Sequence, residues 1–266
     1  MKSILKLAVI ASAVLVSSCG KSDENNNYQG GDDSSLILGN VYNANSSVGK
    51  HFPKKMIQNE NRRGNETIFE VSNGKVTKIG SFLCEYEGNL LKKIKHSDGS
   101  TTEQEFFYSN GKISKAYFRN EGTWDYSYDS KKRLSKEIRT LPNGRQEITE
   151  YQYIDDNTVK TITNGQESTY IFANGNLVRE ETPNNTITYQ YDNKNNWRYA
   201  NKFSLVIDGP LATFLDPSYS SKNNVTKVVA SGYYGSGQVT FEYEYNSEGY
   251  PTKVTNSRGT VTQYEY

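Results

Sequence analysis

Short segments in which apolar and polar residues alternate recur from about residue 66 to the end of the chain. In Phe241–Tyr245, for example, the three aromatic residues alternate with Glu242 and Glu244. Successive side chains of a β-strand point to opposite faces of the sheet, so the pattern predicts strands with one aromatic face and one polar face.

One unit recurs in these segments: an aromatic-x-aromatic strand, a turn that usually holds Gly or Asn, and a strand of the form Leu/Val-x-Lys-x. A repeated supersecondary unit of this kind predicts consecutive β-hairpins. The copies are Phe82–Ile94, Phe106–Lys115, Tyr126–Ile138, Tyr151–Ile162, Tyr170–Arg179 and Phe241–Val254, with a degenerate copy at Ile68–Ile79 and half a copy at Val261–Tyr266.

Asn-Gly pairs mark many of the turns, and they favour type I′ turns because both residues tolerate positive φ angles. They start at Asn73, Asn110, Asn143, Asn164 and Asn174. We therefore predict an all-β domain over residues 66–266: a long antiparallel meander of about sixteen strands. A flat sheet would leave its aromatic face in water, so we expect strong twisting or curling into a partly closed, barrel-like form.

Two segments fall outside this pattern. Residues 36–65 are predicted to be irregular, and residues 192–238 to be a non-repeat insert. Within the insert, Asn201–Leu215 is the most aliphatic stretch of the mature chain, and Asp208-Gly209-Pro210 would interrupt a helix there. We interpret it as a cap or plug against the aromatic face; the alternative is an exposed functional loop, which would present an apolar patch to water.

The N-terminus has the features of a targeting segment. Lys2 and Lys6 supply positive charge, and the run from Leu5 to Val16 is otherwise mainly apolar. This pattern predicts a signal peptide over residues 1–18. Val16-Ser17-Ser18-Cys19 resembles the lipobox of bacterial lipoproteins, and this resemblance implies that Cys19 carries a diacylglycerol and acyl lipid. An ordinary cleaved secretory signal is the alternative. Residues 19–35 are polar and are predicted to form a flexible tether.

The residues directly after the cysteine bear on orientation. Lys21, Ser22, Asp23 and Glu24 resemble the Lys-plus-acidic signal that Bacteroidota-type lipoproteins carry when they are exported to the outer face of the outer membrane. The resemblance implies a lipid-anchored protein that faces the cell exterior. A periplasm-facing orientation is the alternative.

The repeats also resemble known families. Tyr126–Tyr153, with its Tyr128-Asp129 pair, looks like the YD repeats of RHS-type shells. The order of elements in Tyr191–Lys227 resembles a family of uncharacterised Bacteroidota surface lipoproteins with a porin-like β-fold. These resemblances imply a fold and a location, but no activity.

Charge and cysteine content restrict the function further. Loss of residues 1–18 removes two of the 31 basic residues and none of the 30 acidic ones, which gives the mature chain a formal charge of −1. We therefore expect no nucleic-acid partner. Cys84 would be the remaining thiol, and its position between apolar neighbours predicts a small buried hydrophobe rather than a reactive group.

Candidate catalytic chemistry is sparse in the sequence, and we expect neither an enzyme, nor a metal site, nor a cofactor other than the lipid. His51 and His96 are the two histidines, and both are predicted to be solvated. A carboxylate pair of the glycosidase type remains open, but we expect cross-strand pairing with Lys or Arg instead. The candidates are Glu103, Glu105, Glu147, Glu150, Glu242 and Glu244.

A transmembrane barrel is the main alternative for the fold, because its strands also alternate. We predict that the barrel does not span a membrane, since the repeat allows strands of about five to seven residues where about nine to eleven are needed.

Two functional classes remain open. The first is a non-catalytic binding or scaffolding module for a glycan or protein, with Tyr233 and Tyr234 as possible exposed contacts. The alternative is an accessory subunit of an outer-membrane protein complex. A glycan module predicts clustered exposed aromatic residues, whereas an accessory subunit predicts few of them and a partner that co-purifies.

Overall fold

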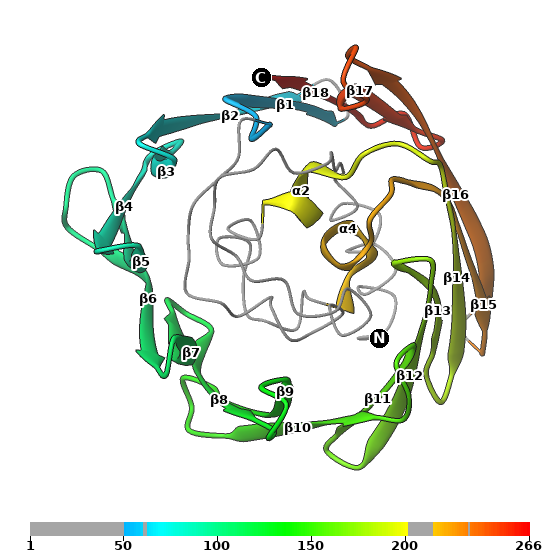
Figure 1. Ribbon diagram of the computed structural model, residues 1–266, viewed down its shortest axis with the longest axis horizontal. Helices are drawn as coiled ribbons and strands as arrows, with labels where there is room; N and C mark the ends of the chain where they lie inside the picture. Colours follow the sequence, from blue (N-terminus) through cyan, green and yellow to red (C-terminus); the bar gives the residue numbers. More distant parts are fainter. Residues whose placement is uncertain (1–50, 61–62, 202–214, 234) are drawn as a thin grey trace.

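The computed structural model describes residues 51–60, 63–201, 215–233 and 235–266. Within these residues, eighteen strands form one sheet in which each strand pairs antiparallel with its neighbours in sequence. The first strand, β1 (Lys55–Glu60), also pairs with the last, β18 (Val261–Glu265), and this closes the sheet into a barrel (Figure 1). The predicted barrel-like meander is thereby confirmed, and closure pairs the two edge strands with each other.

The sheet extends into two segments that were predicted to lie outside it. β1 falls within the segment predicted to be irregular, and β15 (Val225–Gly232) falls within the predicted insert. Neither strand contains the aromatic-x-aromatic motif, and each is held by a partner on both sides. The remaining strands are β2 (Arg63–Ser72), β3 (Lys75–Ile79), β4 (Phe82–Glu87), β5 (Leu90–His96), β6 (Thr102–Ser109), β7 (Lys112–Phe118), β8 (Gly122–Tyr128), β9 (Leu134–Thr140), β10 (Gln146–Tyr153), β11 (Thr158–Thr163), β12 (Gln166–Ala173), β13 (Asn176–Glu181), β14 (Asn185–Tyr191), β15 (Val225–Gly232), β16 (Gly235–Tyr245) and β17 (Pro251–Asn256).

Four of the five Asn-Gly turns have the predicted geometry. Asn73, Asn110, Asn164 and Asn174 have positive φ angles, as do the glycines that follow them. The exception is Asn143-Gly144, where Gly144 has a φ of 81° and its N–H donates to the carbonyl of Leu141 at 2.8 Å. The ring of Pro142 fixes a negative φ, which favours a type I turn followed by a left-handed glycine.

A β-bulge lies directly before the last aromatic residue of most repeats. The register shifts between Glu85 and Tyr86, for example, and this places Tyr86 opposite Leu91. Bulges increase the local twist of a strand pair, and a twist repeated in successive hairpins favours closure of the sheet. The other bulges of this kind precede Tyr108, Tyr128, Phe172, Tyr191 and Tyr245.

Tyrosine hydroxyls connect neighbouring strands in most of the repeats. The Tyr153 hydroxyl on β10 donates to the carbonyl of Leu134 on β9 at 2.8 Å, and six other tyrosines make the equivalent bond. We call these seven residues the tyrosine belt. The other donor and acceptor pairs are Tyr86 and Val76, Tyr108 and Leu91, Tyr128 and Ile113, Tyr191 and Leu177, Tyr243 and Val225, and Tyr266 and Pro251.

The belt predicts the effect of a single hydroxyl group. Tyr153→Phe keeps the ring that stacks on Arg133, whose guanidinium carbon lies 3.8 Å from the ring centroid, but loses the bond to Leu134. We expect the free energy of unfolding to fall by about 1 kcal/mol in chemical denaturation. Phe172 occupies the same position of its repeat without a hydroxyl. Tyr233→Phe is the matched control, because it removes an exposed hydroxyl and should leave stability unchanged. Equal losses in the two variants would contradict the role of the belt.

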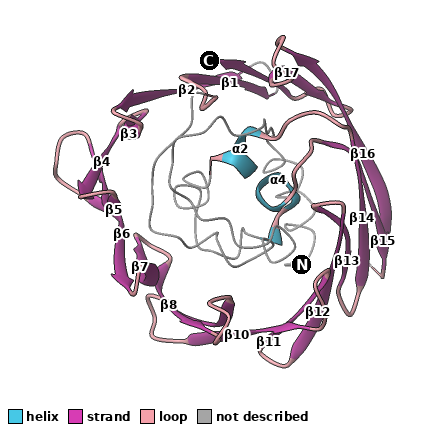
Figure 2. Ribbon diagram, viewed as in Figure 1, coloured by secondary structure: helices cyan, strands magenta, loops and turns pink. Residues whose placement is uncertain are grey.

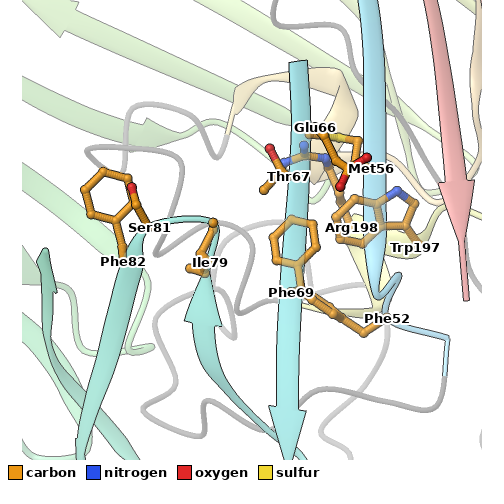
Figure 3. Close-up of a pocket in the computed structure, with 11 residues that line it drawn as sticks. Phe52, Met56, Glu66, Thr67, Phe69, Ile79, Ser81, Phe82, Trp197 and Arg198 are labelled. Atoms are coloured by element: carbon orange, nitrogen blue, oxygen red, sulfur yellow. The ribbon is translucent and has the colours of Figure 1, made fainter. Parts of the chain in front are cut away.

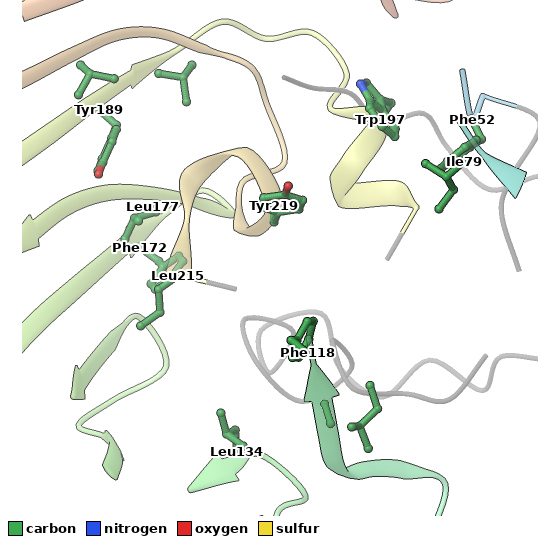
Figure 4. Close-up of a cluster of buried hydrophobic side chains, with 14 of the residues drawn as sticks. Phe52, Ile79, Phe118, Leu134, Phe172, Leu177, Tyr189, Trp197, Leu215 and Tyr219 are labelled. Atoms are coloured by element: carbon green, nitrogen blue, oxygen red, sulfur yellow. The ribbon is translucent and has the colours of Figure 1, made fainter. Parts of the chain in front are cut away.

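The two faces of the barrel differ in character. Buried side chains such as Phe118, Leu134, Phe172 and Leu177 point into the barrel (Figure 4). The opposite face carries ion pairs between neighbouring strands, which matches the predicted polar alternation. Examples are Lys95 with Glu85 at 2.8 Å, Lys93 with Glu105 at 2.8 Å, and Lys115 with Asp125 at 3.3 Å.

The connection between β14 and β15 turns into the barrel. Two short helices, α2 (Trp197–Ala200) and α4 (Pro217–Ser220), lie inside the ring of strands (Figures 1 and 2). The Ser221 hydroxyl accepts a hydrogen bond from the Leu177 N–H of β13 at 3.0 Å, which fixes the connection to the wall. The described ends of the predicted plug therefore lie inside the barrel, while residues 202–214 lie outside the described part of the chain. In that described part, no helix is long and apolar enough to cross a membrane.

Candidate functional site

A pocket of about 400 Å³ lies between α2 and the inner face of the first strands (Figure 3). Phe69 on β2, Ile79 on β3 and Phe82 on β4 contribute apolar side chains from the wall. Phe52, which precedes β1, packs edge-on against Phe69, with ring centroids 5.2 Å apart. The alternation of the strands thus presents a continuous apolar surface to the pocket.

Trp197 forms the opposite side of the pocket. It is the first residue of α2, it is 1% exposed, and its ring meets Phe52 edge-on at 5.4 Å. Asn196 holds the helix in place: its side chain caps α2 by accepting from the Tyr199 N–H at 2.9 Å and also donates to the carbonyl of Ser218 at 3.1 Å. Substituting this cap would therefore disturb the pocket as well as the helix.

Arg198 brings a positive charge to this apolar site. Its side chain is 6% exposed, and its guanidinium lies 4.8 Å from the Trp197 ring centroid and 4.9 Å from that of Tyr219. One guanidinium nitrogen, Nη1, donates to the Tyr219 hydroxyl at 2.6 Å. The flat guanidinium is therefore held between rings, in a fixed orientation.

Two charged side chains belong to the pocket lining. Among the described residues that line it, Arg198 is the one base and Glu66 the one acid. The Glu66 carboxylate pairs with Lys55 at 3.1 Å, and both residues belong to the outward-facing positions of their strands. The charge of Glu66 is therefore compensated by Lys55.

Buried hydrogen-bond donors lie beside Arg198. Trp197 Nε1 and the Tyr264 hydroxyl are buried and have no hydrogen-bond partner within the described ranges. The two rings lie 6.2 Å apart. Burial raises the pKa of Tyr264 well above its ordinary value, and the charge of Arg198 acts against this shift. The hydroxyl therefore stays protonated and can donate.

The residues predicted from the sequence lie elsewhere. Tyr233 is 84% exposed at the turn between β15 and β16, as expected for a surface contact, while Tyr234 lies outside the described residues. Cys19 and Lys21, Ser22, Asp23 and Glu24 also lie outside them. Cys84 faces the interior and packs against the core, where burial raises the pKa of its thiol to about 12. The side chain is half-buried, so the predicted buried hydrophobe is confirmed in part.

The histidines and glutamates have structural contacts. His51 was predicted to be solvated, but its ring stacks on Tyr250 at 3.9 Å and its Nδ1 lies 3.2 Å from a carboxylate oxygen of Glu248. This correction follows from the barrel closure, which brings residue 51 next to the last hairpins. Six glutamates were considered for a carboxylate pair. Five of them instead form an ion pair with a Lys or Arg on or next to a neighbouring strand, as expected. The pairs are Glu103 with Arg119, Glu105 with Lys93, Glu147 with Arg139, Glu150 with Lys136, and Glu244 with Lys253.

Comparisons with known proteins found structural likenesses alone. No protein-family model matches the chain, and no curated protein matches it. The chain is similar to a porin-like protein from Bacteroides vulgatus ATCC 8482, with 14% identity over 80% of this chain and 98% of the other and a TM-score of 0.45. A porin-like protein from Bacteroides uniformis ATCC 8492 gives 12% identity over 83% and 98% of the two chains and a TM-score of 0.43. The Photorhabdus luminescens Tc holotoxin pore gives 13% identity, covers 72% of this chain and 12% of the other, and has a TM-score of 0.35.

Proposed function

We propose that this protein is a non-catalytic binding protein, held at the outer membrane by the lipid on Cys19 and facing the cell exterior, which takes up a small ligand in the pocket beside α2. The observation that carries this proposal is the pocket itself: apolar rings surround about 400 Å³, and a buried arginine lies in its lining. Small-molecule sites combine an apolar, concave lining with a few placed polar groups in this way.

The polar outer face supports a barrel that stands in water rather than in lipid. Charged pairs such as Lys95 with Glu85 lie within the strands, at positions that would face acyl chains in a transmembrane barrel. Charged side chains there cost several kcal/mol near the bilayer midplane. The lipid on Cys19 is then the part of the protein that enters the membrane.

Native mass spectrometry of the full lipidated protein, released from mild detergent, tests ligand binding. We expect a non-covalent small molecule on the wild-type protein and its loss from Trp197→Ala. Tyr233→Ala is the matched control, because it removes an exposed aromatic residue that is not part of the pocket lining. A ligand retained equally by both variants would contradict the pocket as its site.

The second candidate function is an accessory subunit of an outer-membrane complex. The observation that favours it is the outer surface: among the described residues, the large hydrophobic side chains that are exposed include two aromatic ones, Phe107 and Tyr233. They do not form the clustered aromatic platform expected of a surface glycan module. Affinity purification of the native protein would support this candidate if a membrane protein co-purified in stoichiometric amount.

Lipidation makes a separate prediction. Cys19→Ala should abolish incorporation of labelled palmitate and move the protein from the membrane fraction to the soluble fraction. The reason is that the acyl chains of the lipid on this cysteine are the proposed anchor. Cys84→Ala is the matched control, since that thiol is packed inside the barrel and should leave labelling unchanged. Palmitate labelling that survives in Cys19→Ala would contradict the lipobox interpretation.

A further inference from the structure

Two buried hydrogen-bond donors lie at the side of the pocket where Met56 and Trp197 line it. Trp197 Nε1 and the Tyr264 hydroxyl are buried and have no hydrogen-bond partner among the residues that the structure describes. Tyr264 is opposite Met56 in the β1–β18 pair, and its ring centroid lies 6.2 Å from that of Trp197. The two donors are therefore next to each other and next to the lining.

The unpartnered hydroxyl of Tyr264 departs from the pattern of the last hairpins. Tyr243 and Tyr266 belong to the tyrosine belt, and their hydroxyls donate to the carbonyls of Val225 at 2.8 Å and Pro251 at 3.0 Å. Buried polar groups of folded proteins almost always have a hydrogen-bond partner, and an unpartnered one destabilises the fold. A bound molecule with an acceptor atom would supply the partner that Trp197 Nε1 and the Tyr264 hydroxyl lack.

We propose that the ligand of this pocket is a small neutral molecule with an aromatic or aliphatic body and a carbonyl or ether oxygen, which accepts hydrogen bonds from Trp197 Nε1 and the Tyr264 hydroxyl. This inference rests on the proposed function and specifies its ligand class.

The polar groups of the site select a neutral ligand. An indole N–H carries no charge, and burial raises the pKa of Tyr264, so its hydroxyl also donates in the neutral form. The charged residues of the lining already have contacts within the protein: Glu66 pairs with Lys55 at 3.1 Å, and Arg198 donates to the Tyr219 hydroxyl at 2.6 Å. A neutral oxygen satisfies the two donors without bringing a further charge into an apolar surrounding, where it would be costly.

The lining also sets the size of the ligand and its route of entry. A volume of about 400 Å³ lies at the lower end of the range for small-molecule sites and suits a single-ring body. Gly80 and Ser81, which are exposed in the turn between β3 and β4, belong to the lining, so the pocket reaches the surface there. The unbranched side chain of Met56 can adapt its shape, which lets a ligand oxygen approach Tyr264 beside it.

Carbon-13 NMR of 4-phenyl-2-butanone, labelled at its carbonyl, tests the ligand class on the full lipidated protein in mild detergent. A hydrogen bond moves a ketone carbonyl signal downfield, so we expect the bound signal downfield of that from ketone dissolved in the micelles. Tyr264→Phe should weaken binding about fivefold and move the bound signal upfield, because one donor is lost while the ring beside Trp197 is kept. Tyr266→Phe is the matched control, since the Tyr266 hydroxyl donates to Pro251 and the residue lies outside the pocket lining.

A second probe, 3-phenylpropionate, compares an acid with the neutral ketone. We expect the acid to bind more weakly, and tighter binding of the acid would overturn the proposed ligand class. Unchanged ketone affinity and an unchanged carbonyl signal in both Tyr264→Phe and Trp197→Phe would also overturn it, while leaving the pocket as a binding site.

Native mass spectrometry separates failure of the ligand class from failure of the proposed function. If neither probe binds but a ligand that depends on Trp197 is found, an uncharged compound with a carbonyl or ether oxygen supports the class, and an acid or a hydrocarbon contradicts it. If neither probe binds and no ligand that depends on Trp197 is found, the proposed function itself fails.

Discussion

Replacing Gly122 by alanine should lower the free energy of unfolding by about 3 kcal/mol or more, which is a large part of the stability of a typical domain. Gly122 opens β8 with a φ of 111°, where side chains other than glycine are strained. An added Cβ would also lie 2.0 Å from the carbonyl oxygen of Thr140, which is backbone and cannot rotate away. The β8–β9 pairing would therefore have to separate at this end.

Gly144→Ala separates the strain of a positive φ angle from the steric clash of the added Cβ. Gly144 also has a positive φ, 81°, but a Cβ there would meet open space. We expect this control to cost about 1–2 kcal/mol from backbone strain alone. Urea denaturation of the full protein, compared by midpoint and slope, measures both variants. Similar losses for the two substitutions would contradict a close contact between Gly122 and Thr140.

The repeat made most of the barrel predictable. Apolar alternation and Asn-Gly turns are local signals, so the hairpins and four of their turns followed from the sequence. Closure was harder to predict, because it depends on β1 pairing with β18 from the other end of the chain. β1 lacks the aromatic motif, and tertiary pairing rather than its own pattern makes it a strand.

The pocket could not be assembled from sequence. Its wall comes from β1 to β4, while Trp197 and Arg198 come from the connection after β14, more than a hundred residues later. A usable signal did exist: one of the two tryptophans of the chain stands next to an arginine where the repeat breaks. Residues that break a regular pattern are candidates for function, but their partners become visible only when the barrel places them side by side.

Glu137→Gln should make the protein more stable at pH 8.5, by up to about 3 kcal/mol, and leave its stability near pH 4 unchanged. Glu137 is 5% exposed on the inner face of β9, opposite Tyr126 and Thr149. Burial raises the pKa of its carboxyl group from 4.5 to about 7, and the charge of Arg139 acts against this shift. Its Oε2 has no hydrogen-bond partner in the described part of the chain.

The direction of the pH dependence follows from proton linkage. Between pH 4.5 and about 7, the folded protein holds a proton on Glu137 that the unfolded chain has released, so the contribution of this group to stability falls as the pH rises. It is complete below pH 4.5 and lost above about 7. Glutamine has a similar shape and stays neutral throughout, so the variant should lose this part of the pH dependence.

Urea denaturation at pH 4, 6, 7 and 8.5 measures the difference between the wild-type protein and the variant. Glu150→Gln is the matched control, because Glu150 lies on the neighbouring strand β10 but is exposed and paired with Lys136 at 3.4 Å. Exposed pairs of this kind contribute about 0–1 kcal/mol, so the control should show no comparable gain at high pH. If Glu137→Gln and the wild-type protein lose stability in parallel between pH 4 and 8.5, the carboxyl group of Glu137 is ionised in both states, and another group must account for the pH dependence.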